Sequence, residues 1–369
     1  MSGSGGRWRR RSFLGSLAAG AVSLAVAPRG SAHVAPSPTK LGVDNFSVRT
    51  WGWKAPRLIE YAASLKLDTL LLSDLEVYES LDDGYLDRIR GQAADAEIEL
   101  QVGTSSLCPT SNAYDARKWG AAEDHARLLI RTARRVGSPV ARCYLGNRDD
   151  RKGDGGIDRH IDAMVQVLRS VRSEAEDAGV KIAIENHAGD MQAWELVRLI
   201  EAAGKDFVGA TMDPGNAAWT MEDPLVNLEI LGPYALTTGI RDSAVWETAD
   251  GAASMWVNMG EGVVDWPAYV QRFQTLCPQT AFVLEVISYK WSYEMPYLQP
   301  EYWSRFPQAR AAEFARFVAL AKRGQPYAVP PGRPAGEATV ELEQAQQLFD
   351  VEASVRYCRD VLGLGLKKQ

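Results

Sequence analysis

Eight short apolar segments recur along the chain, and each is followed by a stretch in which apolar residues return at helical spacing. The segments start about 25 to 45 residues apart. Strands that alternate with helices predict a parallel sheet. Eight such units within about 280 residues favour a closed (β/α)8 barrel, a TIM barrel, over an open sheet. The predicted strands are residues 40–48, 69–74, 98–105, 140–146, 181–187, 207–213, 235–242 and 281–288.

An open, doubly wound sheet is the competing interpretation. It would place a glycine-rich phosphate-binding turn directly after the first strand. Residues 49–53 read RTWGW and contain no such turn. The pattern therefore favours the barrel.

The N-terminus reads differently from the rest of the chain. Residues 7–11 are cationic, residues 13–27 form an apolar, alanine-rich run, and residues 30–32 are small. This order is typical of a signal peptide, and RRSFL at 10–14 matches the twin-arginine form. We expect residues 1–35 to direct export to the periplasm or the medium. A basic, unstructured N-terminus is the alternative. No stable membrane anchor is expected, because the apolar run falls short of the ~20 residues of a membrane span.

The C-terminal part also changes character. Four prolines lie between residues 326 and 334. The pattern from about residue 337 to 362 is helical, with apolar residues on one side. We therefore divide the mature chain into a barrel at 36–324 and, at 325–369, a Pro-rich linker with a C-terminal helix that packs on the barrel.

Charge and cysteine content exclude some functions. The net charge is −6 with both signs mixed along the chain, which offers no basic face for nucleic acid. The hydrophobic fraction of 46% suffices for a large core. The four cysteines are far apart and form no CxxC pair, so we interpret them as packing residues.

Carboxylates mark the ends of several predicted strands. The segment KIAIENHAGD carries Glu185, Asn186 and His187 at the end of the fifth strand, Asp213 ends the sixth, and Glu285 lies on the eighth. The C-terminal ends of barrel strands meet at one mouth, where active sites lie. Clustered carboxylates repel one another unless a cation offsets their charge, and oxygen ligands suit hard divalent ions. Three unrelated, solvated or ion-paired acids are the alternative.

Five motifs, in this order and spacing, resemble the xylose-isomerase-like TIM barrels. This superfamily contains sugar isomerases and epimerases, and it also has an endonuclease branch. The resemblance covers about residues 40 to 320. Its motifs are IAIENH (182–187), MDPGN (212–216), GIRDS (239–243), GEGVVDW (260–266) and LEVIS (284–288).

The resemblance implies a metal site with Glu, Asp, His and Glu ligands from strands five to eight. Glu185, Asp213 and Glu285 match the first, second and fourth ligands. Gly239 stands where the family commonly has the histidine, and none of the four histidines falls on strand seven. The implied cofactor is a divalent ion, Mn²⁺ or Mg²⁺ before Co²⁺ or Zn²⁺. With Gly239, either water, a neighbouring residue or substrate fills the third position, or metal binding is weak or absent.

The family's chemistry assigns Glu185 and Glu285 to proton exchange at carbons beside a carbonyl, through an enediolate. We expect a metal-dependent isomerase or epimerase acting on a small, unphosphorylated sugar or sugar derivative. A lyase that performs β-elimination or decarboxylation on a keto sugar or keto glycoside is the alternative. A third hypothesis is a carbohydrate-binding barrel without catalytic activity. Any of the three proteins could form a homodimer.

Further polar and aromatic residues at the predicted mouth are candidates for substrate binding. Each also has a plainer explanation, as an internal ion pair, a solvated charge, a loop support or a packed aromatic ring. The candidates are His187, Asn216, Arg241, Asp242, Lys290, Trp51 and Glu261.

Overall fold

Eight parallel strands form a barrel in the computed structural model, which describes residues 39–290, 292–329 and 339–367. The sheet order is β10-β1-β2-β3-β4-β5-β6-β7. A parallel bridge between Ile240 and Leu284 joins its two edges, and the amide of Ile240 donates to the carbonyl of Val283 over 2.7 Å. All eight predicted strands are present. They are β1 (Leu41–Asp44), β2 (Thr69–Leu72), β3 (Glu99–Ser106), β4 (Val140–Tyr144), β5 (Lys181–Glu185), β6 (Val208–Met212), β7 (Ala235–Thr238) and β10 (Phe282–Leu284).

The first predicted strand is shorter than expected. The sequence pattern predicts a strand over residues 40–48, but β1 ends at Asp44 and a 3-10 helix, η1 (Asn45–Trp51), follows. The Asp44 carboxylate accepts a hydrogen bond from the amide of Phe46 and so caps this helix. The apolar Val48 is buried, but it belongs to this helix and not to the strand.

Helices cover the outside of the barrel, as the alternating pattern predicts. In α4 (Ala122–Val136), for example, the buried positions Ala126, Leu129, Ile130 and Ala133 follow a period of three to four residues. Gly137 then ends the helix in the left-handed conformation, with φ of 79°. The other helices of this layer are α1 (Ala55–Ser64), α2 (Asp83–Asp95), α5 (Gly156–Ser170), α6 (Arg172–Ala178), α7 (Ala193–Ala203), α9 (Pro224–Leu231) and α10 (Trp266–Leu276), with the short α3 (Ala116–Trp119) and α8 (Pro214–Trp219) in loops.

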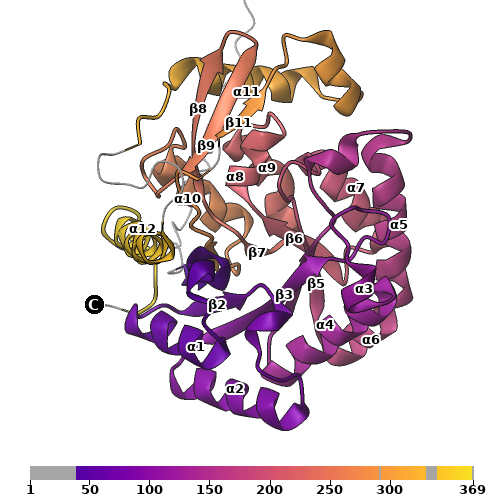
Figure 1. Ribbon diagram of the computed structural model, residues 1–369, viewed down its shortest axis with the longest axis vertical. Helices are drawn as coiled ribbons and strands as arrows, with labels where there is room; N and C mark the ends of the chain where they lie inside the picture. The colour runs from indigo at the N-terminus through magenta and orange to yellow at the C-terminus, as the bar shows by residue number, and fades with distance from the viewer. Residues whose placement is uncertain (1–38, 291, 330–338, 368–369) are drawn as a thin grey trace, which may run out of the picture. The chain divides into compact units, whose positions relative to one another are not determined.

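A three-stranded antiparallel sheet, which the strand-helix pattern did not predict, follows β7. It consists of β8 (Asp242–Thr248), β9 (Gly251–Val257) and β11 (Ser292–Met295), in the order β11-β9-β8. It packs with α11 (Ala311–Arg323) around a second apolar cluster (Figure 1). The β8–β9 hairpin turns at Ala249 and Asp250, between the paired residues Thr248 and Gly251.

The predicted C-terminal helix is present as α12 (Val340–Asp360) and packs against η1. The Gln347 side chain accepts a hydrogen bond from the Thr50 amide over 3.1 Å. The predicted signal peptide and residues 330–338 of the linker lie outside the described residues. All four cysteines are buried free thiols. Within the described ranges, no helix is both long and apolar enough to cross a membrane.

Candidate active site

Three carboxylates from distant parts of the chain converge at the C-terminal ends of the barrel strands. Glu185 is the last residue of β5, Asp213 follows β6, and Glu285 follows β10. One oxygen from each lies within 4.8 Å of the other two. All three residues are at most 5% exposed, so water does little to screen their mutual repulsion.

The guanidinium of Arg241 lies among these three acids. Its Nη2 is 2.6 Å from Asp213 Oδ2 and 3.8 Å from Glu185 Oε1, and it donates a hydrogen bond to Glu285 Oε2. Arginine keeps its charge in proteins. Burial raises the pKa of Asp213 well above its ordinary value, whereas Arg241 opposes that rise. The arginine therefore supplies the positive charge that the cluster needs.

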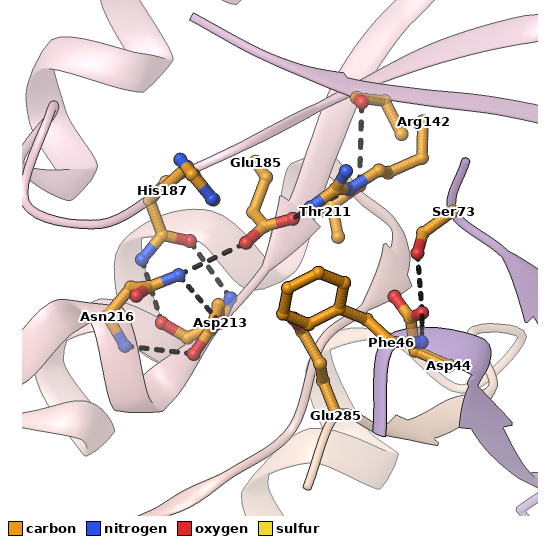
Figure 2. A network of polar contacts seen from close by, with 12 residues as sticks. Asp44, Phe46, Ser73, Arg142, Glu185, His187, Thr211, Asp213, Asn216 and Glu285 are labelled. Atoms are coloured by element: carbon orange, nitrogen blue, oxygen red, sulfur yellow. Dashed lines mark hydrogen bonds and ion pairs between the residues drawn. The ribbon is translucent and has the colours of Figure 1, made fainter. Parts of the chain in front are cut away.

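Glu185 is held from the opposite side by Arg142 of β4. Arg142 Nε donates to Glu185 Oε2 over 2.7 Å (Figure 2). Arg142 Nη1 donates to the Thr104 carbonyl over 3.1 Å. Asn216 Nδ2 donates to Glu185 Oε1 at 3.1 Å and to Asp213 Oδ2 at 2.7 Å. These contacts fix the carboxylate of Glu185 in one orientation.

Asn186 and His187, the two residues after Glu185, have different roles. Asn186 exchanges hydrogen bonds with the backbone of Asp213 at 2.7 and 2.9 Å, so it ties strand ends five and six together. His187 stacks on Tyr144, with ring centroids 3.9 Å apart, and its Nδ1 lies 2.7 Å from the Gly146 carbonyl. A carbonyl can only accept, so Nδ1 carries the proton and Nε2 remains an acceptor. Burial and then the nearby Arg142 lower the pKa of His187 to about 4, which leaves the ring neutral.

Asp44 adds a fourth acid at the end of β1. It accepts hydrogen bonds from Ser73 Oγ at 2.5 Å and from the amide of Phe46 at 2.8 Å (Figure 2). Burial, and then the charge of Glu285, raise its pKa to about 7. Asp44 is therefore poised to hold or release a proton near neutral pH.

A cavity of about 450 Å³ opens above the cluster. This volume lies within the range of small-molecule sites, roughly 300 to 1,000 Å³. Aromatic rings form much of its wall, and Trp219 stacks on Trp256 with centroids 4.3 Å apart. The cavity is lined by Phe46, Asn147, Arg148, Asp149, His187, Ala188, Asn216, Trp219, Arg241, Trp256, Glu285, Ile287 and Ser292.

Comparison with protein families identifies the fold family. Residues 59–313 match the profile described as xylose isomerase-like TIM barrel, which is more than half of the chain. The chain belongs to the xylose isomerase-like TIM barrel family.

Individual relatives of this xylose isomerase-like protein are distant. A curated relative is 3-oxo-isoapionate decarboxylase of Pectobacterium atrosepticum, 20% identical over 239 residues, which cover 63% of this chain and 76% of the relative. Among solved structures, D-psicose 3-epimerase in the presence of D-fructose has a TM-score of 0.58 and 16% identity, covering 88% of this chain and 99% of that one. The IolI protein with a bound zinc atom has a TM-score of 0.53 and 16% identity, covering 77% and 95%. These structural similarities show the fold.

Four of the predicted substrate-binding residues are not among those that line the cavity. Asp242 accepts from the amides of Gly260 and Gly262, 3.0 Å each, so it holds the GEGVVDW loop. Burial raises the Asp242 pKa to about 6.

The other three contact the C-terminal segment that begins at residue 325. Lys290 forms an ion pair with Glu343 of α12 at 2.7 Å, and the Trp51 indole donates to the Gln344 carbonyl at 3.0 Å. Glu261 accepts hydrogen bonds from two tyrosine hydroxyls, including that of Tyr327 at 2.7 Å. In contrast, His187, Asn216 and Arg241 line the cavity with Glu285.

Sequence reasoning missed several residues of the site. Asp44 stands at a strand end, and the rule that selected Glu185 and Asp213 selects it too. Arg142 is a charge inside an otherwise apolar strand, VARCY, and this is itself a signal because buried charges need partners. Phe46 and Trp219 carry no local signal that distinguishes them from the chain's other aromatic residues.

The acidic triad has the oxygen donors that a divalent ion prefers, and its spacing could hold one. The rest of the site does not fit a resident metal. Gly239 offers no ligand side chain, and Arg241 Nη2 already contacts two of the three carboxylates. Arg241 Nη2 lies among the oxygens of all three carboxylates, so an ion could bind to them only if the guanidinium left this position. We therefore derive no catalytic step through a metal.

Proposed function

We propose that this protein is an enzyme that moves a proton at a carbon beside a carbonyl group in a small, unphosphorylated sugar or sugar derivative. The net reaction is isomerisation or epimerisation. The observation that carries this proposal is the convergence of Glu185 and Glu285 around one guanidinium at the base of a cavity with aromatic residues in its wall.

Glu285 is the base that faces the substrate. Its carboxylate lines the cavity, whereas Glu185 is 1% exposed and lies deeper, oriented by Arg142 and Asn216. Two carboxylates from different strands can act on different faces or carbons of one substrate, as proton return in an isomerase or epimerase requires. Arg241 is aimed at the oxygen on which negative charge develops.

The aromatic wall and the polar floor suit a sugar. Trp219 and Trp256 add apolar surface to the cavity wall, and His187 Nε2 and Asn216 offer hydrogen-bonding atoms for hydroxyl groups. The similarity to D-psicose 3-epimerase supports the same substrate class. We also propose export through the twin-arginine signal at residues 10–14. An exported enzyme would meet unphosphorylated sugars, because phosphorylated sugars are mostly kept inside the cell.

A decarboxylase is the second candidate. The curated relative is named 3-oxo-isoapionate decarboxylase, and loss of CO₂ from a 3-oxo acid passes through the same kind of enolate as proton removal beside a carbonyl. Arg148 stands at the cavity wall, where it could bind a substrate carboxylate.

Incubation with ketoses, aldoses and 3-oxo sugar acids in D₂O tests both candidates. Mass spectrometry and NMR would follow the products. Deuterium gained at a carbon beside the carbonyl, with the carbon skeleton intact, supports the isomerase or epimerase. Loss of CO₂ supports the decarboxylase. Tight sugar binding without any deuterium gain or mass change would contradict both and indicate a binding protein.

A further inference from the structure

We infer that Arg241 is the resident cation of this site and takes the place of a divalent metal. Its guanidinium both neutralises the acidic triad and binds the carbonyl oxygen of the substrate. The second part of this inference rests on the proposed function, whereas the first does not.

The position of Arg241 supports the inference first. Nη2 lies 2.6 Å from Asp213, contacts Glu285, and is 3.8 Å from Glu185, so one nitrogen is shared by the same three oxygens that would ligate an ion. The side chain is 3% exposed. The attraction of the three carboxylates therefore keeps the charged side chain of Arg241 in this buried position.

Two glycines make this arrangement possible, because a side chain at either position would disturb it. A Cβ at Gly239 would lie 3.2 Å from Glu285 Oε2 and 3.6 Å from Asp213 Oδ2, so a larger side chain there would enter the cluster beside the guanidinium. A Cβ at Gly215 would lie 2.1 Å from Cγ and 2.8 Å from Cδ of Arg241. Gly215 thus provides the space through which the arginine stem passes.

The remaining contacts of Arg241 leave it ready for a ligand. The guanidinium carbon lies 4.3 Å from the ring centroid of Trp256, whose indole donates to the Gly215 carbonyl over 3.1 Å. Arg241 Nε and Asn216 Oδ1 have no hydrogen-bond partner among the described residues, although both atoms are buried. Both residues line the cavity. A buried donor and a buried acceptor without partners are costly, and a bound hydroxy-carbonyl compound would satisfy both.

The proton transfer balances without a metal. The C–H bond beside the carbonyl breaks, and its proton goes to the Glu285 carboxylate. The electron pair of that bond moves into the carbon skeleton, and the carbonyl oxygen gains the negative charge. Arg241 donates hydrogen bonds to that oxygen, and the proton then returns to carbon. Arg241 therefore acts as the electrophile that a metal ion would otherwise supply.

Metal binding tests the inference directly. Mn²⁺ would be titrated into purified full-length protein and followed by electron paramagnetic resonance, with circular dichroism as the check on folding. We expect no saturable Mn²⁺ binding by the unaltered protein. The variant Gly239→His/Arg241→Ala removes the guanidinium and supplies the missing ligand, and we expect it to bind one Mn²⁺ per chain. Adding Asp213→Asn to that variant should abolish the binding.

Two results would overturn the inference. One is stoichiometric Mn²⁺ binding by the unaltered protein that Asp213→Asn removes. The other is a folded Gly239→His/Arg241→Ala variant that binds no Mn²⁺, because the triad would then not be a cation site that the arginine occupies. Neither result depends on the reaction, so both remain decisive if the proposed isomerase activity is absent. Where activity is present, we expect EDTA to leave it unchanged and Arg241→Ala to abolish it.

Discussion

Gly215→Ala is the most economical perturbation of the site, because it adds one methyl group and changes no charge. The added Cβ would lie 2.1 Å from Arg241 Cγ, whereas carbon atoms normally approach to about 3.5 to 4.0 Å. The clash involves the stem of the side chain and not its flexible end. Small adjustments cannot relieve it, so we expect the guanidinium to leave its place between the carboxylates.

The cost follows from the contacts that are lost. Removing one partner from a buried ion pair destabilises a protein by about 3 to 5 kcal/mol. Gly215 lies in α8, where alanine is favoured over glycine by about 1 kcal/mol. We therefore expect Gly215→Ala to lower the free energy of unfolding by about 2 to 4 kcal/mol. It should also abolish any proton-transfer activity.

Chemical denaturation provides the measurement, and Gly91→Ala provides the matched control. Gly91 lies in α2, and a Cβ there meets nothing within 4 Å, so we expect that variant to be as stable as the unaltered protein or slightly more so. If Gly215→Ala behaves like Gly91→Ala in both stability and activity, the stem of Arg241 does not occupy the space above Gly215 and our account of the site is wrong.

Three further predictions concern the acids and the histidine. Glu285→Gln should reduce deuterium incorporation into the substrate by roughly 10²- to 10⁴-fold, with binding retained, because a general base is lost; an unchanged rate would exclude Glu285 from this role. The pKa of Asp44 is raised to about 7 in the fold, so the folded state binds the extra proton, and stability should fall as pH rises from about 4 to about 7. Denaturation at several pH values should show a smaller fall in Asp44→Asn, and an equal fall in both proteins would contradict the prediction. Because His187 is neutral with a pKa of about 4, NMR titration of its ring should show no transition near the ordinary value of about 6.5.

Much of the fold follows from local patterns. Each strand of the barrel is an apolar run flanked by turn residues, and each helix repeats its apolar residues every three to four positions, so short-range spacing was sufficient to predict the eight units. The antiparallel sheet of β8, β9 and β11 was not predicted, because β11 pairs with β9 from about 40 residues away. The helix that Asp44 caps after β1 was also not predicted, because its first residues continue the apolar pattern of the strand.

The residues of the site also fall into those that local sequence patterns predict and those that they do not. Glu185, Asp213 and Glu285 could be chosen because each stands at a strand end, and strand ends of a barrel must meet. Asp242, Lys290, Trp51 and Glu261 satisfy the same rule of position, yet they contact the GEGVVDW loop, α12 and neighbouring tyrosines. Whether a side chain after a strand enters the cavity depends on the loop that follows it, and that loop is shaped by distant segments.

The sequence alone therefore determined the barrel and the acidic character of its mouth, because strand-helix alternation leaves few other ways to bury eight apolar strands. It also placed Gly239 where the family has a ligand. Only the tertiary structure decided what compensates for that loss. The position of Arg241 depends on the empty space above Gly215, the ring face of Trp256 and three carboxylates from separate strands. A buried charge is stable only where all its partners surround it at once, and the spacing of residues along a chain does not record that arrangement.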